Sequence, residues 1–287
     1  MNKLHGTGVA LVTPFTEAGA VDLAAWTRLL DFTIAGGCEY LVINGTTGES
    51  PTTTAAEKTE LLRVAREHVA GRVPLVYGIG GNDTAAVERQ LRDTDLTGVT
   101  AILSASPAYN KPSQAGLLAH YQRLADAAPL PLLLYNVPGR TGSNLLADTT
   151  LQLAGHPNIV GIKEASGNVE QCLHLLAHKP ADFLFLSGDD LLTVPLIACG
   201  AGGVISVLAN AFPQRFSNMT RAALAGDYAR AQQELFYFVG LNPLMYEEGN
   251  PVGVKAALAL HGVCEPAVRL PLVPASARLT ERLKARL

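Results

Sequence analysis

The sequence has little charge, few cysteines and no long apolar run, and each shortage excludes a class of protein. Only 16% of its 287 residues are charged, the net charge is −3, and no block of basic residues occurs. Nucleic acid is therefore not an expected partner. The four cysteines are scattered and form no CxxC pair: Cys38, Cys172, Cys199 and Cys264. We expect neither structural zinc nor disulfides, and we interpret the cysteines as small apolar residues of a reduced, cytoplasmic protein.

The apolar runs are too short to cross a membrane. The opening residues, "MNKLHGTGVALVTPF", contain one short apolar stretch that Pro14 interrupts, and the other apolar runs have the length of strands. We therefore expect no signal peptide and no membrane partner. What the chain has in abundance is apolar residues, at 48%, which is enough for a sizeable core.

Eight short, β-branched apolar runs alternate with amphipathic stretches rich in alanine and leucine. The runs lie at residues 8–14, 40–44, 74–80, 99–105, 131–137, 158–164, 182–188 and 203–207. They are almost continuously apolar, which is typical of parallel strands covered on both faces. Eight such units predict an α/β fold, a (β/α)8 TIM barrel. An open, doubly wound sheet is the alternative.

The strand pattern stops near Gly226, and the rest of the chain has the pattern of helices. We expect a catalytic barrel at residues 1–225 and a small helical domain at residues 226–287. No internal repeat or low-complexity segment is visible beyond the alternation itself.

Lys163 ends the sixth apolar run, where a parallel barrel would deliver it to its active face. One interpretation is a structural lysine paired with Glu164 or Asp189. The other is a nucleophile that forms a Schiff base, because an amine attacks a carbonyl when neutral and burial favours the neutral form. Tyr135 ends the fifth run, next to Lys163 in barrel order. It is either a core residue or a group that moves protons beside the lysine.

Two loops could hold anionic groups. "GTTGES" (45–50) places hydroxyls between glycines before a helical stretch, so Thr46, Thr47 or Ser50 either bind a carboxylate or cap the helix. Arg140, in "VPGRTG", either grips a carboxylate or is a solvated surface arginine.

Metal binding is not favoured by the histidine and acid patterns. His174 and His178 have i,i+4 spacing, but no acid follows the first histidine as in HExxH. Asp189 and Asp190 could be catalytic carboxylates, although capping of the next helix is favoured.

These segments together resemble the pyruvate-dependent class I aldolases of the dihydrodipicolinate synthase and N-acetylneuraminate lyase superfamily. The resemblance covers nearly the whole chain. It is carried by "GTTGES" (45–50), "YNVPGRTG" (135–142), "GIKEASG" (161–167), "SGDD" (187–190) and "NPVGVK" (250–255), in family order.

The resemblance implies a catalytic role for four residues. Lys163 matches the Schiff-base lysine, and Tyr135 matches the tyrosine of the proton relay. Thr46 matches the hydroxyl that links this tyrosine to a second one. Tyr109 matches that second tyrosine, which a neighbouring subunit contributes.

Four further residues match substrate-binding positions of the family. Thr47 matches the residue that binds the pyruvate carboxylate, and Arg140 matches the arginine that holds the carboxylate of the aldehyde substrate. The backbone groups of Gly188 and Ile205 match positions that line the lysine.

The resemblance implies condensation of pyruvate with aspartate 4-semialdehyde through an imine on Lys163, the committed step of the diaminopimelate route to lysine. It implies no metal and no dissociable cofactor. Two alternatives are another aldolase of the superfamily, acting on a sugar-derived 2-keto acid, and a barrel that only binds a metabolite. Arg140 argues against the first, and the presence of all the catalytic residues argues against the second. A homo-oligomer is implied, either a tetramer built from two dimers or a dimer.

The chain departs from the family pattern at a site where lysine inhibits some members. Ala108 replaces the first of two adjacent tyrosines, and Ala55, Lys58 and Ala86 replace histidines and a glutamate. Lys58 would repel the ammonium group of a lysine effector. We therefore expect weak or absent inhibition by lysine.

Overall fold

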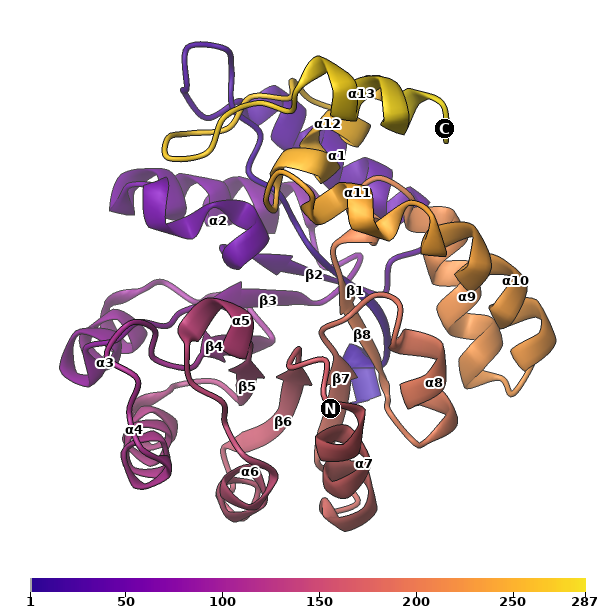
Figure 1. The fold of residues 1–287 in the computed structure, drawn as a ribbon. Helices are drawn as coiled ribbons and strands as arrows, with labels where there is room; N and C mark the ends of the chain where they lie inside the picture. The colour runs from indigo at the N-terminus through magenta and orange to yellow at the C-terminus, as the bar shows by residue number, and fades with distance from the viewer. Residues whose placement is uncertain (1) are drawn as a thin grey trace.

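Eight parallel strands form a closed barrel in the order of the chain (Figure 1). The computed structural model describes residues 2–287. The strands are β1 (Gly6–Ala10), β2 (Tyr40–Ile43), β3 (Leu75–Gly78), β4 (Ala101–Ala105), β5 (Leu132–Asn136), β6 (Ile159–Glu164), β7 (Leu184–Ser187) and β8 (Gly203–Ser206). The predicted barrel is confirmed. The open-sheet alternative is wrong, because β8 pairs with β1 and closes the sheet.

Helices surround the barrel on its outer side, except for the short α5, which lies at the end of β5 (Figure 1). In chain order they are α1 (Leu23–Ala35), α2 (Ala55–Val69), α3 (Thr84–Asp93), α4 (Gln114–Ala127), α5 (Pro138–Thr141), α6 (Ala147–Leu153), α7 (Val169–His178), α8 (Thr193–Ala198) and α9 (Pro213–Leu224). Four short 3-10 turns accompany them: η1 (Asn2–Leu4), η2 (Thr46–Gly48), η3 (Ser50–Thr52) and η4 (Leu208–Asn210). Two of these, η2 and η3, lie between β2 and α2 and shape the "GTTGES" loop.

The alternation of side chains along each strand divides the apolar residues into an inner and an outer core. The inner cluster includes Tyr40, Tyr135 and Ile205, and the outer cluster joins the strands to the helices. Tyr40 is fully buried, and its hydroxyl donates to the carbonyl of Val204 at 2.9 Å. A Cβ atom at Gly8 would lie 2.1 Å from the Tyr40 ring, so this position of β1 has room only for glycine.

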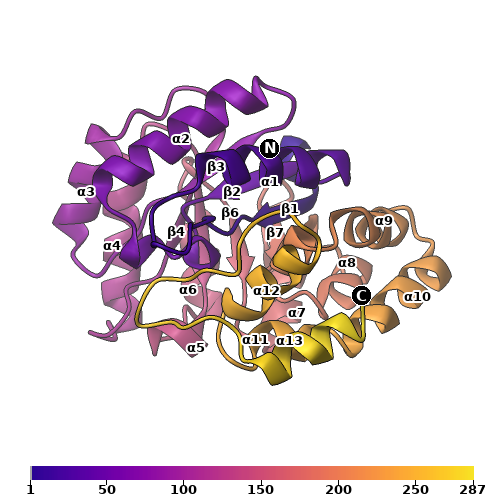
Figure 2. The ribbon, with the colours of Figure 1, turned by 90° about the horizontal axis from the view of Figure 1, so that it is seen from above.

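The chain ends in α10 (Tyr228–Val239), α11 (Asn242–Tyr246), α12 (Val252–Leu260) and α13 (Ala277–Lys284). The proposed division between residues 225 and 226 falls between α9 and α10. These two helices pack through aromatic rings, with the centroids of Phe216 and Phe238 5.4 Å apart. Figures 1 and 2 show the segment between α12 and α13 beside the segment between β1 and α1. The last part of the chain therefore returns to the start of the barrel.

None of the helices in residues 2–287 is long and apolar enough to span a membrane.

Candidate active site

Lys163 and Tyr135 lie side by side on adjacent strands. They are register partners between β6 and β5, and the Nζ atom of Lys163 is 4.3 Å from the centroid of the Tyr135 ring. Only 5% of Lys163 and 7% of Tyr135 is exposed. Both residues are at the carboxyl ends of their strands, where the active face of a parallel barrel lies. The predicted pairing of these two side chains is confirmed.

Lys163 is not a structural lysine held by an acid. Its sequence neighbour Glu164 is buried, and its carboxylate accepts from Asn136 Nδ2 at 2.9 Å, Gln171 Nε2 at 3.0 Å and the Ser166 N–H at 2.6 Å. Successive residues of a strand point to opposite faces, so Glu164 faces away from the barrel interior. No ion pair formed within residues 2–287 includes Lys163. The alternative of a pair with Glu164 or Asp189 is wrong, and the amine has no acidic partner within the described residues.

Thr46 and Thr47 form the turn η2 directly after β2, and they do not cap α2. Thr54 is the capping residue: its hydroxyl accepts from the Glu57 N–H at 3.2 Å, and the Glu57 carboxylate accepts from the Thr54 N–H at 2.8 Å. The interpretation of "GTTGES" as a capping turn is therefore wrong. Thr13 fixes the turn from β1, because its hydroxyl donates to the Gly48 carbonyl at 2.6 Å.

A cavity of about 630 Å³ opens at this end of the barrel. Three of the predicted site residues line it, namely Thr46, Tyr135 and Arg140. Lys163, Thr47, Tyr109, Gly188 and Ile205 are not among its lining residues. Lys163 is nevertheless adjacent to the cavity, because its amine is 4.3 Å from the centroid of the Tyr135 ring, and Tyr135 lines the cavity.

Arg140 lies on the short helix α5, in an exposed position at the rim of the cavity. It takes part in none of the ion pairs of the described chain. An arginine offers five donors in a planar fork that matches a carboxylate. The position suits capture of an incoming anionic substrate.

Gly188 directly follows β7, and Ile205 lies on β8, the two strands that come after β6 around the barrel. The Gly188 N–H donates to the Glu164 carbonyl at 2.7 Å, and a Cβ at position 188 would lie 2.5 Å from that of Ala165. Ile205 is 1% exposed and belongs to the inner core with Tyr135. Both therefore close the barrel near the lysine.

Tyr109 is exposed and does not line the cavity of its own chain. Its side chain is 88% exposed, and its backbone has a φ of 72°, a left-handed conformation that is uncommon for a residue with a side chain. The Tyr109 N–H donates to the Thr141 carbonyl at 3.3 Å, which ties this loop to α5. A role in catalysis by Tyr109 requires a second subunit.

The two aspartates after β7 have different surroundings. Asp189 accepts from the N–H groups of Leu191 and Leu192 at 3.0 and 3.4 Å, in the turn that precedes α8. Asp190 is buried and instead accepts from the N–H groups of Val207 and Leu208 at the end of β8, at 3.2 and 2.9 Å. The helix α8 begins at Thr193 with Leu192 as its N-cap and has no side-chain cap, so the expected capping role is wrong for both aspartates. Burial raises the pKa of Asp190 to about 6.

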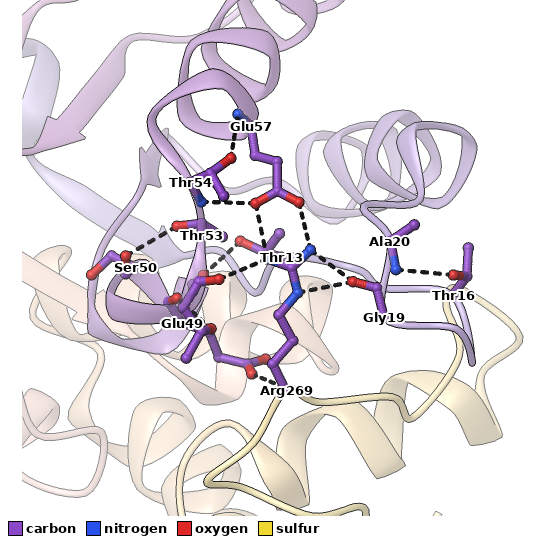
Figure 3. Close-up of polar contacts among 12 residues, drawn as sticks. Thr13, Thr16, Gly19, Ala20, Glu49, Ser50, Thr53, Thr54, Glu57 and Arg269 are labelled. Atoms are coloured by element: carbon purple, nitrogen blue, oxygen red, sulfur yellow. Dashed lines mark hydrogen bonds and ion pairs between the residues drawn. The ribbon is translucent and has the colours of Figure 1, made fainter.

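Sequence reasoning assigned no role to several buried charged and polar residues behind the "GTTGES" loop. Glu49 pairs with Lys255 at 2.5 Å, and Asn250 donates to Thr47 at 3.1 Å. The Arg269 N–H donates to Glu49 at 3.0 Å, and its guanidinium contacts Glu57 and the Gly19 carbonyl (Figure 3). Asn250 and Lys255 lie in the motif "NPVGVK", but their partners are more than 200 positions away in the chain.

No group of three or more histidine, cysteine and acidic side chains within residues 2–287 is placed to hold a metal ion.

The fold and the site together define a (β/α)8 barrel with a buried lysine and tyrosine at its active face. The chain belongs to the dihydrodipicolinate synthetase family, whose model matches residues 3–287.

Relatives and solved structures are similar to the chain over nearly its whole length. A 4-hydroxy-tetrahydrodipicolinate synthase of Cytophaga hutchinsonii is 51% identical over 284 residues, which are 99% of this chain and 96% of the relative. A monomeric variant of a dihydrodipicolinate synthase superimposes with a TM-score of 0.96 at 36% identity, covering 99% of this chain and 96% of that one. A dihydrodipicolinate synthase of Acinetobacter baumannii, solved with pyruvate, has a TM-score of 0.95 at 37% identity, covering 99% and 97%.

Proposed function

We propose that this protein is a 4-hydroxy-tetrahydrodipicolinate synthase, a lyase that condenses pyruvate with aspartate 4-semialdehyde on the route to diaminopimelate and lysine. The observation that carries the proposal is the buried amine of Lys163, unpaired by any acid and 4.3 Å from the Tyr135 ring centroid. The names of the relatives and the pyruvate complex of a similar structure support the choice of substrates.

The first half of the reaction loads pyruvate onto the chain. The neutral amine of Lys163 attacks the ketone carbon, and water leaves as the carbon–nitrogen double bond forms. A proton then leaves the methyl carbon, and its electron pair moves toward the imine nitrogen to give an enamine. Tyr135 lies beside the nitrogen and is placed to move these protons, with Thr46 on the cavity wall as the next hydroxyl.

The second half of the reaction joins the two substrates and frees the lysine. The enamine carbon attacks the aldehyde carbon, a carbon–carbon bond forms, and the aldehyde oxygen takes up a proton. The amino group of the second substrate then attacks the imine carbon and displaces Lys163 as a free amine, which closes the ring. Because the imine withdraws the electrons, the proposed steps need no metal or dissociable cofactor.

Two carboxylates have to be held during these steps. Thr47 donates to the carboxylate of pyruvate, and Arg140 at the rim grips that of the aldehyde substrate. The backbone groups of Gly188 and Ile205 line the lysine on its other side. Tyr109 completes the proton relay from a neighbouring subunit, in a homotetramer of two dimers located in the cytoplasm.

A coupled assay tests the reaction and its substrates together. Pyruvate and aspartate 4-semialdehyde are supplied, and a dihydrodipicolinate reductase reports the product by consuming NADPH. We expect steady consumption with the wild-type protein. Lys163→Ala should lower kcat by at least about 1,000-fold, since the nucleophile is gone, while Lys284→Ala on the exposed end of α13 should leave the rate unchanged.

Borohydride trapping with pyruvate separates the possible failures. An adduct on Lys163 without turnover would mean an aldolase that uses another aldehyde. The absence of both turnover and adduct in the wild-type protein would contradict the proposed chemistry.

A further inference from the structure

The Thr47 side chain forms a hydrogen bond with a residue 203 positions away in the sequence. The amide nitrogen Nδ2 of Asn250 donates to the Thr47 hydroxyl oxygen at 3.1 Å. Thr47 is 3% exposed and Asn250 is 9% exposed, so water has little access to the bond. Asn250 lies just before α12, in the helical segment of the chain, while Thr47 lies in the turn after β2. The hydrogen bond therefore joins the segment before α12 to the loop that follows β2 at the active face.

The direction of this hydrogen bond decides what Thr47 can offer a ligand. A hydroxyl has one hydrogen to donate and two lone pairs that accept. With the Asn250 amide oriented so that Nδ2 donates, Thr47 uses a lone pair in this contact and keeps its hydrogen, and Asn250 Oδ1 has no hydrogen-bond partner within residues 2–287. Among the hydrogen bonds of residues 2–287, none uses that hydrogen within the chain. The Thr47 hydroxyl is therefore prepared as a donor, which is what a carboxylate needs.

A buried ion pair holds the two partners in place. Two residues after Thr47, Glu49 has a left-handed backbone with a φ of 53° and only 4% exposure. Its carboxylate is 2.5 Å from the amine of Lys255, which is fully buried, and it accepts the Arg269 N–H at 3.0 Å. Lys255 also donates to the Ala267 carbonyl at 2.7 Å. Burial lowers the pKa of Lys255, and Glu49 opposes this shift.

Phe15 packs against the two cations that contact Glu49, namely Lys255 and Arg269. Its ring is fully buried. The amine of Lys255 and the guanidinium carbon of Arg269 are each 4.2 Å from the centroid of this ring. Both cations are thereby fixed by a rigid side chain as well as by acids. Rotation or drift of the loop relative to Asn250 would break several buried contacts at once.

We propose that Asn250 is a positioning residue that fixes the Thr47 hydroxyl as a hydrogen-bond donor to the carboxylate of the 2-oxo acid substrate. The proposal rests on the proposed function, because it takes pyruvate as the ligand of Thr47. It extends the site beyond the barrel, since the residue that orients the hydroxyl comes from the helical segment.

Two substitutions at position 250 separate orientation from simple support. Asn250→Asp keeps the shape but replaces the donor with an acceptor, so it takes up the Thr47 hydrogen and adds a negative charge near the substrate. Asn250→Ala removes the partner and leaves the hydroxyl free to rotate. We expect KM for pyruvate to rise at least about 30-fold in Asn250→Asp and about 3- to 10-fold in Asn250→Ala, with kcat within about threefold in both.

The matched control is Asn168→Asp. Asn168 is exposed and caps α7, where aspartate caps equally well, so the same change of charge is made without touching Thr47. This variant should keep the wild-type KM for pyruvate. KM for aspartate 4-semialdehyde should stay within about twofold in all the variants, because Arg140 is unaffected.

A double-mutant cycle covers the case in which Asn250→Asp fails to fold. Thr47→Val removes the hydroxyl, so Asn250→Ala should add nothing to its effect on KM for pyruvate. Independent, multiplied effects would overturn the proposal, as would a larger defect in Asn250→Ala than in Asn250→Asp. The pyruvate concentration that gives half-maximal borohydride trapping should rank the variants in the same order as their KM for pyruvate.

The outcomes for the wild-type protein keep the two proposals apart. If it turns over both substrates and the variants at position 250 leave KM for pyruvate unchanged, the role of Asn250 is wrong and the proposed function stands. If it gives neither turnover nor an adduct with pyruvate, both are wrong.

Discussion

At the scale of the residue, the site depends on which face of a strand a side chain occupies. Lys163 and Glu164 are neighbours in sequence, yet β6 turns the lysine toward Tyr135 and the acid toward Asn136 and Gln171. A sequence-adjacent acid is therefore prevented from neutralising the amine by ion pairing. The pattern of the run at residues 158–164 predicted the place of Lys163, but it left the pair with Glu164 open.

Arg140 is the residue to which we assign the choice of aldehyde. We expect Arg140→Ala to raise KM for aspartate 4-semialdehyde by about 30- to 100-fold, because a two-point charged hydrogen bond to its carboxylate is lost. Formation of the pyruvate imine should be spared, as measured by borohydride trapping.

Arg63→Ala is the control for this prediction. Arg63 is an exposed arginine of α2 that pairs with Glu60 and Glu67, and its removal should leave both KM values unchanged. An equal loss of imine formation and aldehyde use in Arg140→Ala would contradict the role given to Arg140.

At the scale of the element, the start of α2 is held by the segment between α12 and α13. All five N–H donors of the Arg269 guanidinium have acceptors: the Gly19 carbonyl twice, the Thr52 carbonyl once and the Glu57 carboxylate twice (Figure 3). The hydrogen bonds from Arg269 lower the pKa of Glu57 to about 2. Glu57 also completes the capping box of α2 with Thr54. Glu57 thus connects the start of α2 to Arg269 in the segment between α12 and α13.

The lowered pKa of Glu57 makes part of the stability depend on pH. The stabilisation is fully present above the ordinary pKa of about 4.5 and is lost as the pH falls toward the folded value of about 2. We expect Glu57→Gln, which keeps the capping geometry, to cost about 1 kcal/mol at neutral pH after allowance for solvent screening. Thermal unfolding at about pH 7 and about pH 3 should show the gap from wild type shrinking in acid.

The control for this prediction is Glu67→Gln, an exposed partner of Arg63 on the same helix. It should change the unfolding temperature little at either pH. A gap between wild type and Glu57→Gln that stays constant, or grows, in acid would show that the charge of Glu57 does not matter.

At the scale of the whole molecule, the role proposed for Tyr109 would connect function to assembly. Its exposed side chain lies outside the cavity of its own chain, so the proposed relay needs a second subunit. Lys163→Ala and Tyr109→Phe should each be nearly inactive as pure proteins. An equal mixture of the two should recover about one quarter of the wild-type rate, because about half of the dimers are mixed and each mixed dimer has one intact site of two. The measurement is the coupled assay after unfolding and refolding the variants together.

Recovery in that mixture distinguishes two arrangements. If Tyr109 served the site of its own chain, both sites of a mixed dimer would be defective and no activity would return. Mixing each variant with itself is the control, and sedimentation of the wild-type protein gives the size of the assembly.

Inhibition by lysine is the second property of the whole assembly that the chain predicts. Lys58 and Ala108 line the same cavity as Arg140, and Lys58 brings a positive charge to the place that a lysine effector would occupy. We expect the rate at about 1 mM L-lysine to equal that with norleucine, which has the same carbon chain without the side-chain ammonium. A clear fall in rate with lysine alone would contradict this expectation.

The sequence by itself determined the barrel and the place of the chemistry. Runs of apolar residues buried on both faces specify parallel strands, and eight of them with intervening helices close into a barrel. Because such strands end at one face, the positions of Lys163 and Tyr135 followed from their place at the ends of two successive runs. These patterns are local and are repeated along the chain, so the structure predicted from them agrees with the observed barrel.

Only the tertiary structure decided how the "GTTGES" loop is held. Asn250, Lys255 and Arg269 reach Thr47, Glu49 and Glu57 across more than 200 positions, and no periodicity of the sequence relates residues so far apart. Burial also raised the pKa of Asp190, whose sequence neighbour Asp189 only makes local hydrogen bonds in the turn before α8. Hydrogen-bond direction, ion pairing and burial depend on which distant segments meet, and that is fixed only when the chain closes on itself.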